Sequence, residues 1–203
     1  MKNLKLEMHF AAAAALCAAG AANAAVVVWN INQVVPATID GLYVNVETQQ
    51  AITTAGSGLP GWDLNPYGTS TTSISFFWAG APGASAGVRL GTGATLANLA
   101  TGFTVGASLT GATFGTGGAS FAATAQGKWI YNAVNNFGFR FTNAAGEVRY
   151  GWGAMQVGAN AGTRTLLTIA YEDSGGSIQV GAIPAPGAIA LLGVAGLVSR
   201  RRR

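Results

Sequence analysis

The chain has 203 residues, of which 50% are hydrophobic, 9% are charged and 30 are glycine. Its formal net charge of +4 arises at the two ends, because residues 25–183 carry five basic against six acidic side chains, or about −1. These residues therefore offer no basic patch for a phosphate backbone, which excludes a nucleic-acid partner. The single histidine and the single cysteine both precede residue 25. For the rest of the chain this excludes Ser-His-Asp and Cys-His catalysis, disulfides, and zinc or haem held by those residues.

The first 24 residues have the three parts of a secretory signal peptide. Two lysines form a positive n-region, residues 10–20 form an alanine-rich apolar segment, and Ala22 and Ala24 occupy the small-residue positions that signal peptidase requires. We expect cleavage after Ala24. The alternative is a buried N-terminal helix, but the apolar segment is short and a strand-like segment follows it directly.

Apolar residues alternate with period two through much of residues 25–182, and long amphipathic helical patterns are scarce. Turns rich in glycine, serine and threonine separate the alternating segments, and no fixed repeat is present. We therefore expect an all-β fold, a single antiparallel β-sandwich or jelly-roll-like domain. The glycine-rich segment 91–118 is expected to form loops and short edge strands. The expected strands are 25–30, 41–47, 73–78, 120–125, 128–132, 137–141, 165–171 and 177–180.

Residues 137–157 are the strongest hairpin candidate, because residues 143–146 (Asn-Ala-Ala-Gly) supply turn chemistry between two apolar segments. With an even-length loop, the three phenylalanines of 137–141 would share a face with Tyr150 and Trp152. Cross-strand aromatic pairs contribute about 0.2–1 kcal/mol each. An odd-length loop or a bulge would break this alignment.

Aromatic side chains are candidates for stacking on sugar rings, because they present flat apolar area in a fixed orientation. Trp78 and Trp152 lie on period-two apolar faces, so core packing is the simpler interpretation for both. Trp62 and Tyr67 lie in the loop-like stretch GWDLNPYG, and they are the candidate glycan-binding residues. The full set of candidates is Trp62, Tyr67, Trp78, Trp129, Tyr150 and Trp152.

Acidic residues suggest neither a metal site nor catalysis. Asp63 and Asn65 have oxygens suited to calcium, but no further carboxylate lies nearby in the sequence, so Asx-turns are the simpler interpretation. Glu172 and Asp173 are adjacent in an expected strand and would point to opposite faces, which is unsuitable for a glycosidase pair. We expect Glu172 to pair with an arginine. The chain is therefore expected to be no enzyme and to hold no metal or cofactor.

The C-terminal residues 183–203 combine two prolines, a short apolar segment and an arginine cluster. As a helix, the apolar segment would span less than about 20 Å, short of the roughly 30 Å hydrocarbon core of a bilayer. The arginines would stay in the cytoplasm, so the segment suits a temporary stop in the inner membrane. The residues concerned are Pro184, Ala185, Pro186, Gly187, Arg200, Arg201, Arg202 and Arg203.

This tail, together with the signal peptide, resembles the PEP-CTERM sorting signal of Gram-negative bacteria, with Ala185 in place of the usual glutamate. The order of the segments FGFRF, YGW and AYE in residues 137–172 is also similar to secreted PEP-CTERM proteins. The resemblance implies a compact all-β ectodomain and processing by an exosortase, a membrane protease or transpeptidase. It implies no activity for the ectodomain.

These features predict three segments: a signal peptide (1–24), a β-sandwich ectodomain (25–182) and a sorting signal (183–203). The expected product is an exported, non-catalytic protein of the cell surface or extracellular matrix, with a structural role linked to exopolysaccharide or biofilm. The alternative is a carbohydrate-binding module that uses the loop aromatics. The expected partners are signal peptidase, exosortase, the inner membrane during processing, and exopolysaccharide.

Overall fold

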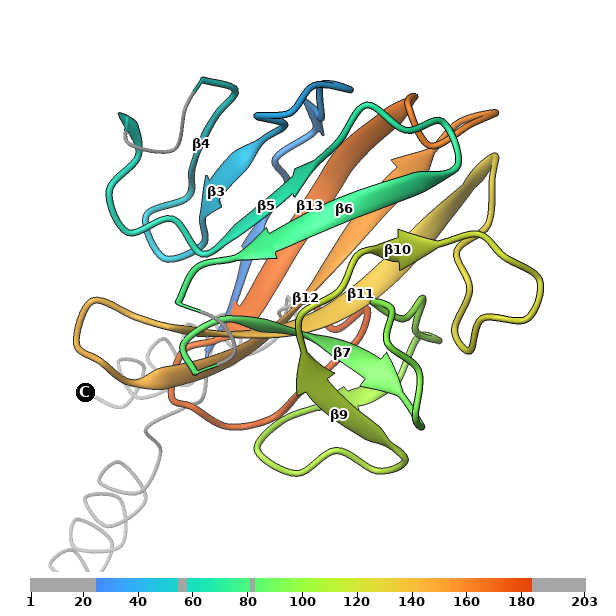
Figure 1. The fold of residues 1–203 in the computed structure, drawn as a ribbon. Coiled ribbons are helices and arrows are strands. Elements are labelled where there is room, and N and C mark those ends of the chain that lie inside the picture. Colours follow the sequence, from blue (N-terminus) through green and yellow to red (C-terminus); the bar gives the residue numbers. More distant parts are fainter. Residues whose placement is uncertain (1–24, 55–57, 81–82, 184–203) are drawn as a thin grey trace, which may run out of the picture.

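Antiparallel β-sheets account for the regular structure of the computed structural model, which describes residues 25–54, 58–80 and 83–183 (Figure 1). No α-helix occurs within these ranges, so none of the described residues forms a helix that could cross a membrane. The strands are β1 (Val26–Trp29), β2 (Gln33–Val34), β3 (Tyr43–Asn45), β4 (Gln50–Ile52), β5 (Leu64–Tyr67), β6 (Ser73–Trp78), β7 (Ala86–Leu90), β8 (Thr104–Val105), β9 (Ala112–Gly115), β10 (Ala119–Ser120), β11 (Ala133–Thr142), β12 (Val148–Val157), β13 (Arg164–Glu172) and β14 (Ile178–Gln179).

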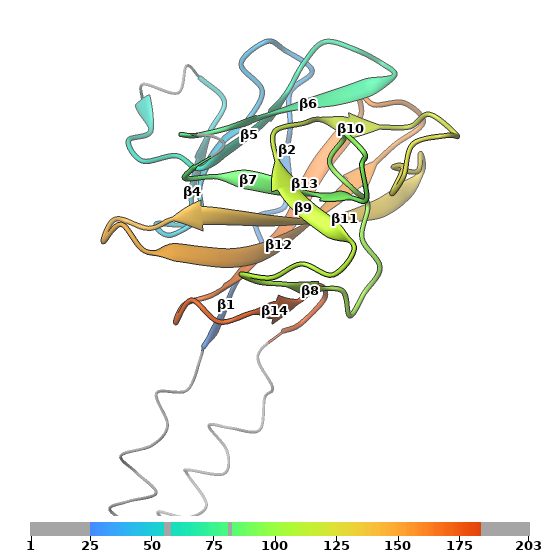
Figure 2. The same ribbon diagram turned by 60° about the horizontal axis from the view of Figure 1, so that its bottom comes forward.

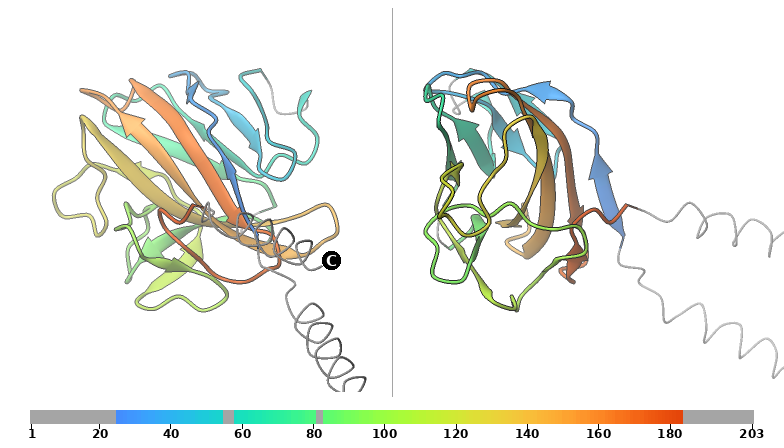
Figure 3. Two further views of the ribbon diagram at one scale, coloured as in Figure 1. Left: turned by 180° about the vertical axis from the view of Figure 1, so that it is seen from behind. Right: turned by 90° about the vertical axis from the view of Figure 1, so that its right-hand side faces the viewer.

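Two of the sheets pack face to face as a sandwich (Figure 3). The larger is seven-stranded, in the order β1-β13-β12-β11-β7-β9, with β2 also paired to β13. The smaller is five-stranded, in the order β10-β6-β5-β3-β4. A short ribbon of β14 and β8 forms a third layer, because its side chains cover the far face of the seven-stranded sheet.

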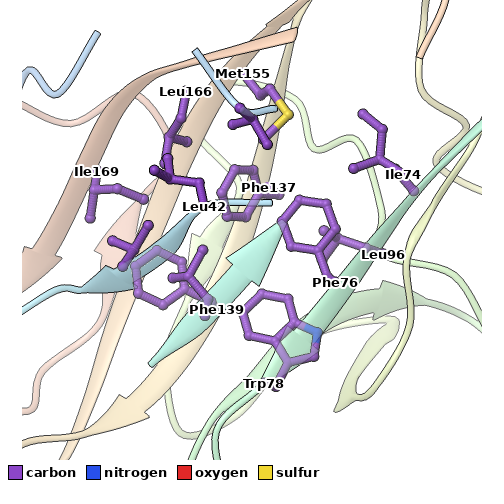
Figure 4. Close-up of a cluster of buried hydrophobic side chains, with 14 of the residues drawn as sticks. Leu42, Ile74, Phe76, Trp78, Leu96, Phe137, Phe139, Met155, Leu166 and Ile169 are labelled. Atoms are coloured by element: carbon purple, nitrogen blue, oxygen red, sulfur yellow. The ribbon is translucent and has the colours of Figure 1, made fainter. Parts of the chain in front are cut away.

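The main core lies between the two large sheets, where aromatic rings from β6 and β11 meet (Figure 4). Phe76 contacts Phe137 edge to face, with ring centroids 5.4 Å apart, and stacks on Trp78 at 5.6 Å. Leu166 and Ile169 of β13 close the same cluster. In β6 and β11 this packing follows period-two alternation, because only alternate side chains reach the facing sheet. In β13 a register shift opposite Ala154 and Met155 breaks the alternation, so Leu166 and Ile169 face the same core although they are three residues apart.

A second core covers the opposite face of the seven-stranded sheet. Trp152 of β12 is 5% exposed there, and it belongs to the same cluster as Val88, Val105 and Ile178. The central strands are therefore buried on both faces, which explains why six consecutive residues of β12 are inaccessible.

In the β11–β12 hairpin, the aromatic side chains of the two strands lie on opposite faces, whereas an even-length loop would have placed them on the same face. Thr142 pairs with Val148, and the Asn143 N–H donates to the Glu147 carbonyl at 2.9 Å, which leaves an odd, three-residue loop ending in Gly146 at φ +80°. A left-handed glycine at this position is typical of a type I turn with a bulge. The register then places Tyr150 and Trp152 on the face opposite the three phenylalanines, so the expected shared face was wrong.

Across this hairpin, the residues that pair with Phe137 and Phe139 are glycines, not aromatic residues. Gly151 pairs with Phe139, and Gly153 pairs with Phe137. A Cβ at Gly153 would lie 2.4 Å from the Phe137 Cζ, and one at Gly151 would lie 2.5 Å from the Phe139 Cζ. The rings therefore occupy the space that these glycines leave open.

Arg164 ties three segments together at one end of the sandwich. The residue is 2% exposed, and its guanidinium donates to the carbonyl oxygens of Ala161 (3.0 Å), Pro36 (2.9 Å) and Gly68 (2.8 Å). Desolvation by this burial lowers the pKa of Arg164 from its usual value. The side chain thereby joins β13 to loops that precede β3 and follow β5.

Most of the expected strands are present, and two expectations were wrong. The segment 73–78 matches β6, while 25–30, 41–47, 137–141, 165–171 and 177–180 each contain or overlap a strand. Segment 91–118 forms loops and short strands as expected, with β9 at the edge of its sheet. By contrast, β10 ends at Ser120, and residues 121–132 form turns and loops. Their aromatic side chains fill the core without pairing in a ladder: Trp129 is buried, and its Nε1 donates to the Leu96 carbonyl at 3.0 Å.

The two ends of the described structure, residues 25 and 183, leave it on the same side (Figure 2). The Ala25 N–H donates to the Asp173 carboxylate at 2.9 Å, which holds the start of β1 against the end of β13. The expected signal peptide, with Ala22 and Ala24, and the expected tail from Pro184 to Arg203 lie outside the described residues.

Candidate glycan-binding surface

Trp62 and Tyr67 line one hollow of about 240 Å³ on the outer face of the five-stranded sheet. The structure thus brings together the two residues that the sequence singles out. Four further residues complete the lining; three of them belonged to no expected site, and Asn65 was considered only as a possible calcium ligand. The six lining residues are Ile39, Tyr43, Trp62, Asn65, Tyr67 and Phe77.

The position of Tyr67 corrects the expectation of a loop, because Leu64–Tyr67 forms β5 at the centre of its sheet. Leu64 pairs with Trp78 and points into the core, and Asn65 pairs with Phe77. Alternation therefore turns Asn65, Tyr67 and Phe77 toward the outer face. The Asn-Pro pair of this segment is typical of turns, which explains why the strand was missed.

Trp62 is held at the hollow by two aromatic neighbours. Its ring centroid lies 5.1 Å from that of Tyr43, edge to face, and 5.6 Å from that of Phe77, tilted. Phe77 is 55% exposed and Ile39 is 78% exposed, so the hollow presents apolar area to solvent. Contiguous exposed aromatic area of this kind marks a binding surface more often than a scattered apolar residue does.

Asn65 is the buried polar group of this surface. It is 2% exposed, and its Nδ2 donates to the Asp40 carbonyl at 2.6 Å. None of the six lining residues is charged. The hollow therefore combines aromatic faces with a fixed amide, two tyrosine hydroxyls and no ionic group.

The other aromatic candidates lie in the protein interior. Trp78, Trp129, Tyr150 and Trp152 are 8% exposed or less, and each belongs to one of the two cores. The core interpretation of Trp78 and Trp152 is thus confirmed. Both tryptophans contribute to folding rather than to the outer hollow.

Asp63 and Asn65 do not form the expected Asx-turns. Asp63 accepts the Val46 N–H at 2.8 Å across the sheet, while Asn65 binds the Asp40 carbonyl. Desolvation raises the pKa of Asp63 to about 7, with a smaller contribution from the Glu47 charge, and the Val46 hydrogen bond opposes the rise. Asp63 therefore keeps its proton to a higher pH than an ordinary carboxyl does.

Among the described residues, no ion pair joins Glu172 to an arginine, contrary to what the sequence had led us to expect. Glu172 is buried, and its Oε1 accepts the Ser174 N–H at 2.9 Å. The ion pair found within the described ranges joins Arg149 to Glu147, beside the hairpin turn. No group of three or more His, Cys, Asp or Glu side chains gathers at one point in the part of the chain that the structure describes.

Comparison with known proteins gave no match to a family model, a curated protein or a solved structure.

Proposed function

We propose that this chain is an exported, non-catalytic protein of the cell surface or extracellular matrix, and that it binds polysaccharide in the outer hollow. The single observation that supports the binding role is the convergence of Trp62 and Tyr67 with Tyr43 and Phe77 around one solvent-open hollow. The export and sorting parts of the proposal rest on the signal peptide and on the PEP-CTERM-like tail, which would be processed by signal peptidase and exosortase at the inner membrane.

The chemistry of the hollow suits a neutral sugar. The apolar C–H faces of a pyranose ring stack on aromatic rings, which fix its orientation at low entropic cost. Sugar hydroxyls need donors and acceptors, and the hydroxyls of Tyr43 and Tyr67, which line the hollow, can act as both. Without a cation among the lining residues, an acidic sugar would lose hydration and gain no partner.

A structural role in the matrix follows from this binding mode. A hollow of about 240 Å³ is smaller than the pockets of about 300–1,000 Å³ that enclose drug-sized ligands, so most of a polymer would stay in solvent. A domain of this kind would hold a polymer without cleaving it. Many weak contacts along one polymer would add avidity.

The test uses a fragment of residues 25–183, which contains both cores and every described strand. Binding to exopolysaccharide from the producing cell is measured by pull-down and calorimetry, together with a neutral and an acidic purified polymer. We expect saturable binding to the neutral polymer that weakens about tenfold or more in Trp62→Ala, the order of loss for a central aromatic anchor.

The matched control is Ile130→Ala, because Ile130 is also an exposed apolar residue (52%) but does not line the hollow. The control should bind like the unaltered fragment. Binding that is absent, or that is equal in both variants, would contradict the glycan-binding proposal.

Sorting is tested separately in the producing cell. Replacing Arg200 to Arg203 with neutral residues should leave precursor at the inner membrane or in the periplasm and reduce the surface-exposed or released product. Unchanged processing would contradict a sorting role for the tail.

A further inference from the structure

We propose that the outer hollow continues into a second cavity at the edge of β6, and that the two together bind an internal stretch of a neutral polysaccharide chain. The inference rests on the proposed glycan-binding function and extends it from one hollow to a longer site. The edge cavity measures about 340 Å³. Its described lining residues are Phe76, Phe77, Trp78, Gly80 and Thr116.

The edge cavity runs beside the backbone of β6 and not over one face of its sheet. Three consecutive residues of the strand, 76–78, line it. Consecutive side chains of a strand point to opposite faces, so a cavity that touches all three lies at the strand edge. The rings of Phe76 and Trp78 point into the main core (Figure 4), whereas Phe77 is exposed.

This edge is open because β10 covers only the start of β6. β10 pairs with Ser73 and Ile74 and with no later residue of β6 (Figure 1). The Trp78 Nε1 donates to the Gly117 carbonyl at 3.4 Å, which holds the segment before β10 near the end of β6. Thr116, in the same segment, is exposed and lines the cavity from that side.

The open edge supplies hydrogen-bonding groups from the backbone. The Ala79 N–H donates to the Asp63 carbonyl at 2.9 Å, so these two residues are a hydrogen-bonded pair of the β5–β6 ladder. Such pairs alternate along an antiparallel ladder, so Phe77 bonds to β5, while the N–H and C=O groups of Phe76 and Trp78 point away from β5. No described strand pairs with those two residues on that side. Their backbone donors and acceptors therefore face the cavity.

Phe77 joins the two cavities, because it lines both the outer hollow and the edge cavity. On the hollow side, the Trp62 ring lies 5.6 Å from the Phe77 ring, centroid to centroid. A sugar chain that stacks on Trp62 would therefore continue over Phe77 to the edge of β6. Aromatic rings in such a row suit successive sugar units, since each ring presents flat apolar area in a fixed orientation.

The chemistry of the edge favours a sugar chain over an added peptide strand. None of the described lining residues of either cavity is charged, so both suit the same neutral polymer. Sugar hydroxyls pair with single groups, here the backbone of Phe76 and Trp78 and the hydroxyl of Thr116. A peptide strand requires a ladder of such groups. In the open part of β6 only Phe76 and Trp78 offer them, and Gly80, at φ +62°, ends the extended backbone just beyond.

The longer site makes affinity depend on chain length. The experiment measures by calorimetry how fragment 25–183 binds a disaccharide, a tetrasaccharide and a hexasaccharide cut from the neutral polymer. We expect the affinity to rise about three- to tenfold from the disaccharide to the tetrasaccharide, the order of one added stacking contact. Trp62→Ala should weaken binding at every length.

Thr116→Met places a longer side chain in the edge cavity and should abolish the rise, so that the tetrasaccharide binds like the disaccharide. The matched control is Thr124→Met, which makes the same change at an exposed loop residue that lines neither cavity. This control should retain the rise. Circular dichroism verifies that both variants are folded.

Nuclear magnetic resonance of the unaltered fragment locates the chain without any variant, and it decides the outcome if Thr116→Met is not folded. The amide signals of Phe76 and Trp78 should shift with the tetrasaccharide and not with the disaccharide. The amide signal of Ile130, an exposed residue outside both cavities, should shift with neither.

The outcomes separate this inference from the proposed function. Equal affinity for the three lengths, with Trp62→Ala still weakening binding, would overturn the longer site and leave glycan binding in the hollow. Absence of binding at every length would contradict both. A rise that persists in folded Thr116→Met would overturn the edge cavity as part of the site. Amide shifts of Phe76 and Trp78 with a neutral octapeptide rich in valine and threonine, but not with the tetrasaccharide, would overturn the proposal in favour of strand addition.

Discussion

Asp63 should make the protein less stable as the pH rises from about 4 to about 7. Its carboxyl has a pKa of about 7 in the folded chain, raised from 3.8 chiefly by desolvation. Within this window the folded state keeps the proton while the unfolded state has lost it. Because the unfolded state then binds fewer protons, the free energy of unfolding falls with increasing pH, opposite to the usual behaviour of a paired carboxylate.

The size of the effect follows from the shift. Each pKa unit corresponds to about 1.4 kcal/mol, so the rise from 3.8 to about 7 costs up to about 4 kcal/mol of stability above pH 7. Asp63 is only 5% exposed, and burial of this extent raises the pKa of a carboxyl because it disfavours the charged form. The full effect is reached once the pH exceeds the folded pKa, and none of it is present below about pH 4.

Urea unfolding of fragment 25–183 and of its Asp63→Asn variant, from pH 4 to pH 8, isolates this contribution. The asparagine retains an oxygen for the Val46 N–H and cannot ionise. The difference between the two free energies of unfolding should therefore change by several kcal/mol across the window, in favour of the variant at high pH. Parallel pH profiles for the two proteins would refute the proposed burial of an ionisable Asp63.

Three further substitutions test the packing and the hollow. Gly153→Ala should lower the free energy of unfolding by about 1–3 kcal/mol, because its Cβ would overlap the facing phenylalanine ring, while Gly83→Ala, whose Cβ meets nothing closer than 3.7 Å, should change it by less than about 0.5 kcal/mol. Equal urea midpoints would contradict the ring-over-glycine packing. Arg164→Met should cost about 2–4 kcal/mol, since three carbonyls lose their donor; a neutral result in thermal melts would exclude that role. Phe77→Ala should weaken polymer binding less than Trp62→Ala does. Among the aromatic residues that line the hollow, Trp62 contacts both Tyr43 and Phe77, whereas Phe77 contacts only Trp62. A larger loss of affinity in Phe77→Ala, measured by calorimetry, would contradict the central place of Trp62.

Alternation of apolar residues was sufficient to predict the all-β class and the strand 73–78, because each sheet buries alternate side chains and local periodicity records that requirement. The same reasoning failed for 121–132, where aromatic residues are buried from a loop, as the buried Trp129 shows. It also failed for β5, where Asn65 and Pro66 suggest a turn. In both places a tertiary contact outweighed the local preference.

A difference of one residue in the length of the β11–β12 loop decided which side chains of the hairpin share a face. Gly146 adopts φ +80° and leaves three residues in the turn, which moved Tyr150 and Trp152 to the face opposite Phe137. The turn residues 143–146 are compatible with an even or an odd loop, so the sequence does not distinguish the two lengths. A shift of one residue reverses every side chain of a strand, so only the paired structure decided which aromatics meet.

The sequence by itself determined the β class and the absence of histidine and cysteine after residue 24, and it indicated Trp62 and Tyr67 as candidate glycan-binding residues. Only the tertiary structure decided which residues surround them, because Tyr43 and Phe77 reach the hollow from other strands. It also made Phe77 a shared wall of the hollow and the edge cavity. Sites of this kind are assembled by strand pairing between distant segments, and the side chains of one short segment do not specify the pairing that joins it to another.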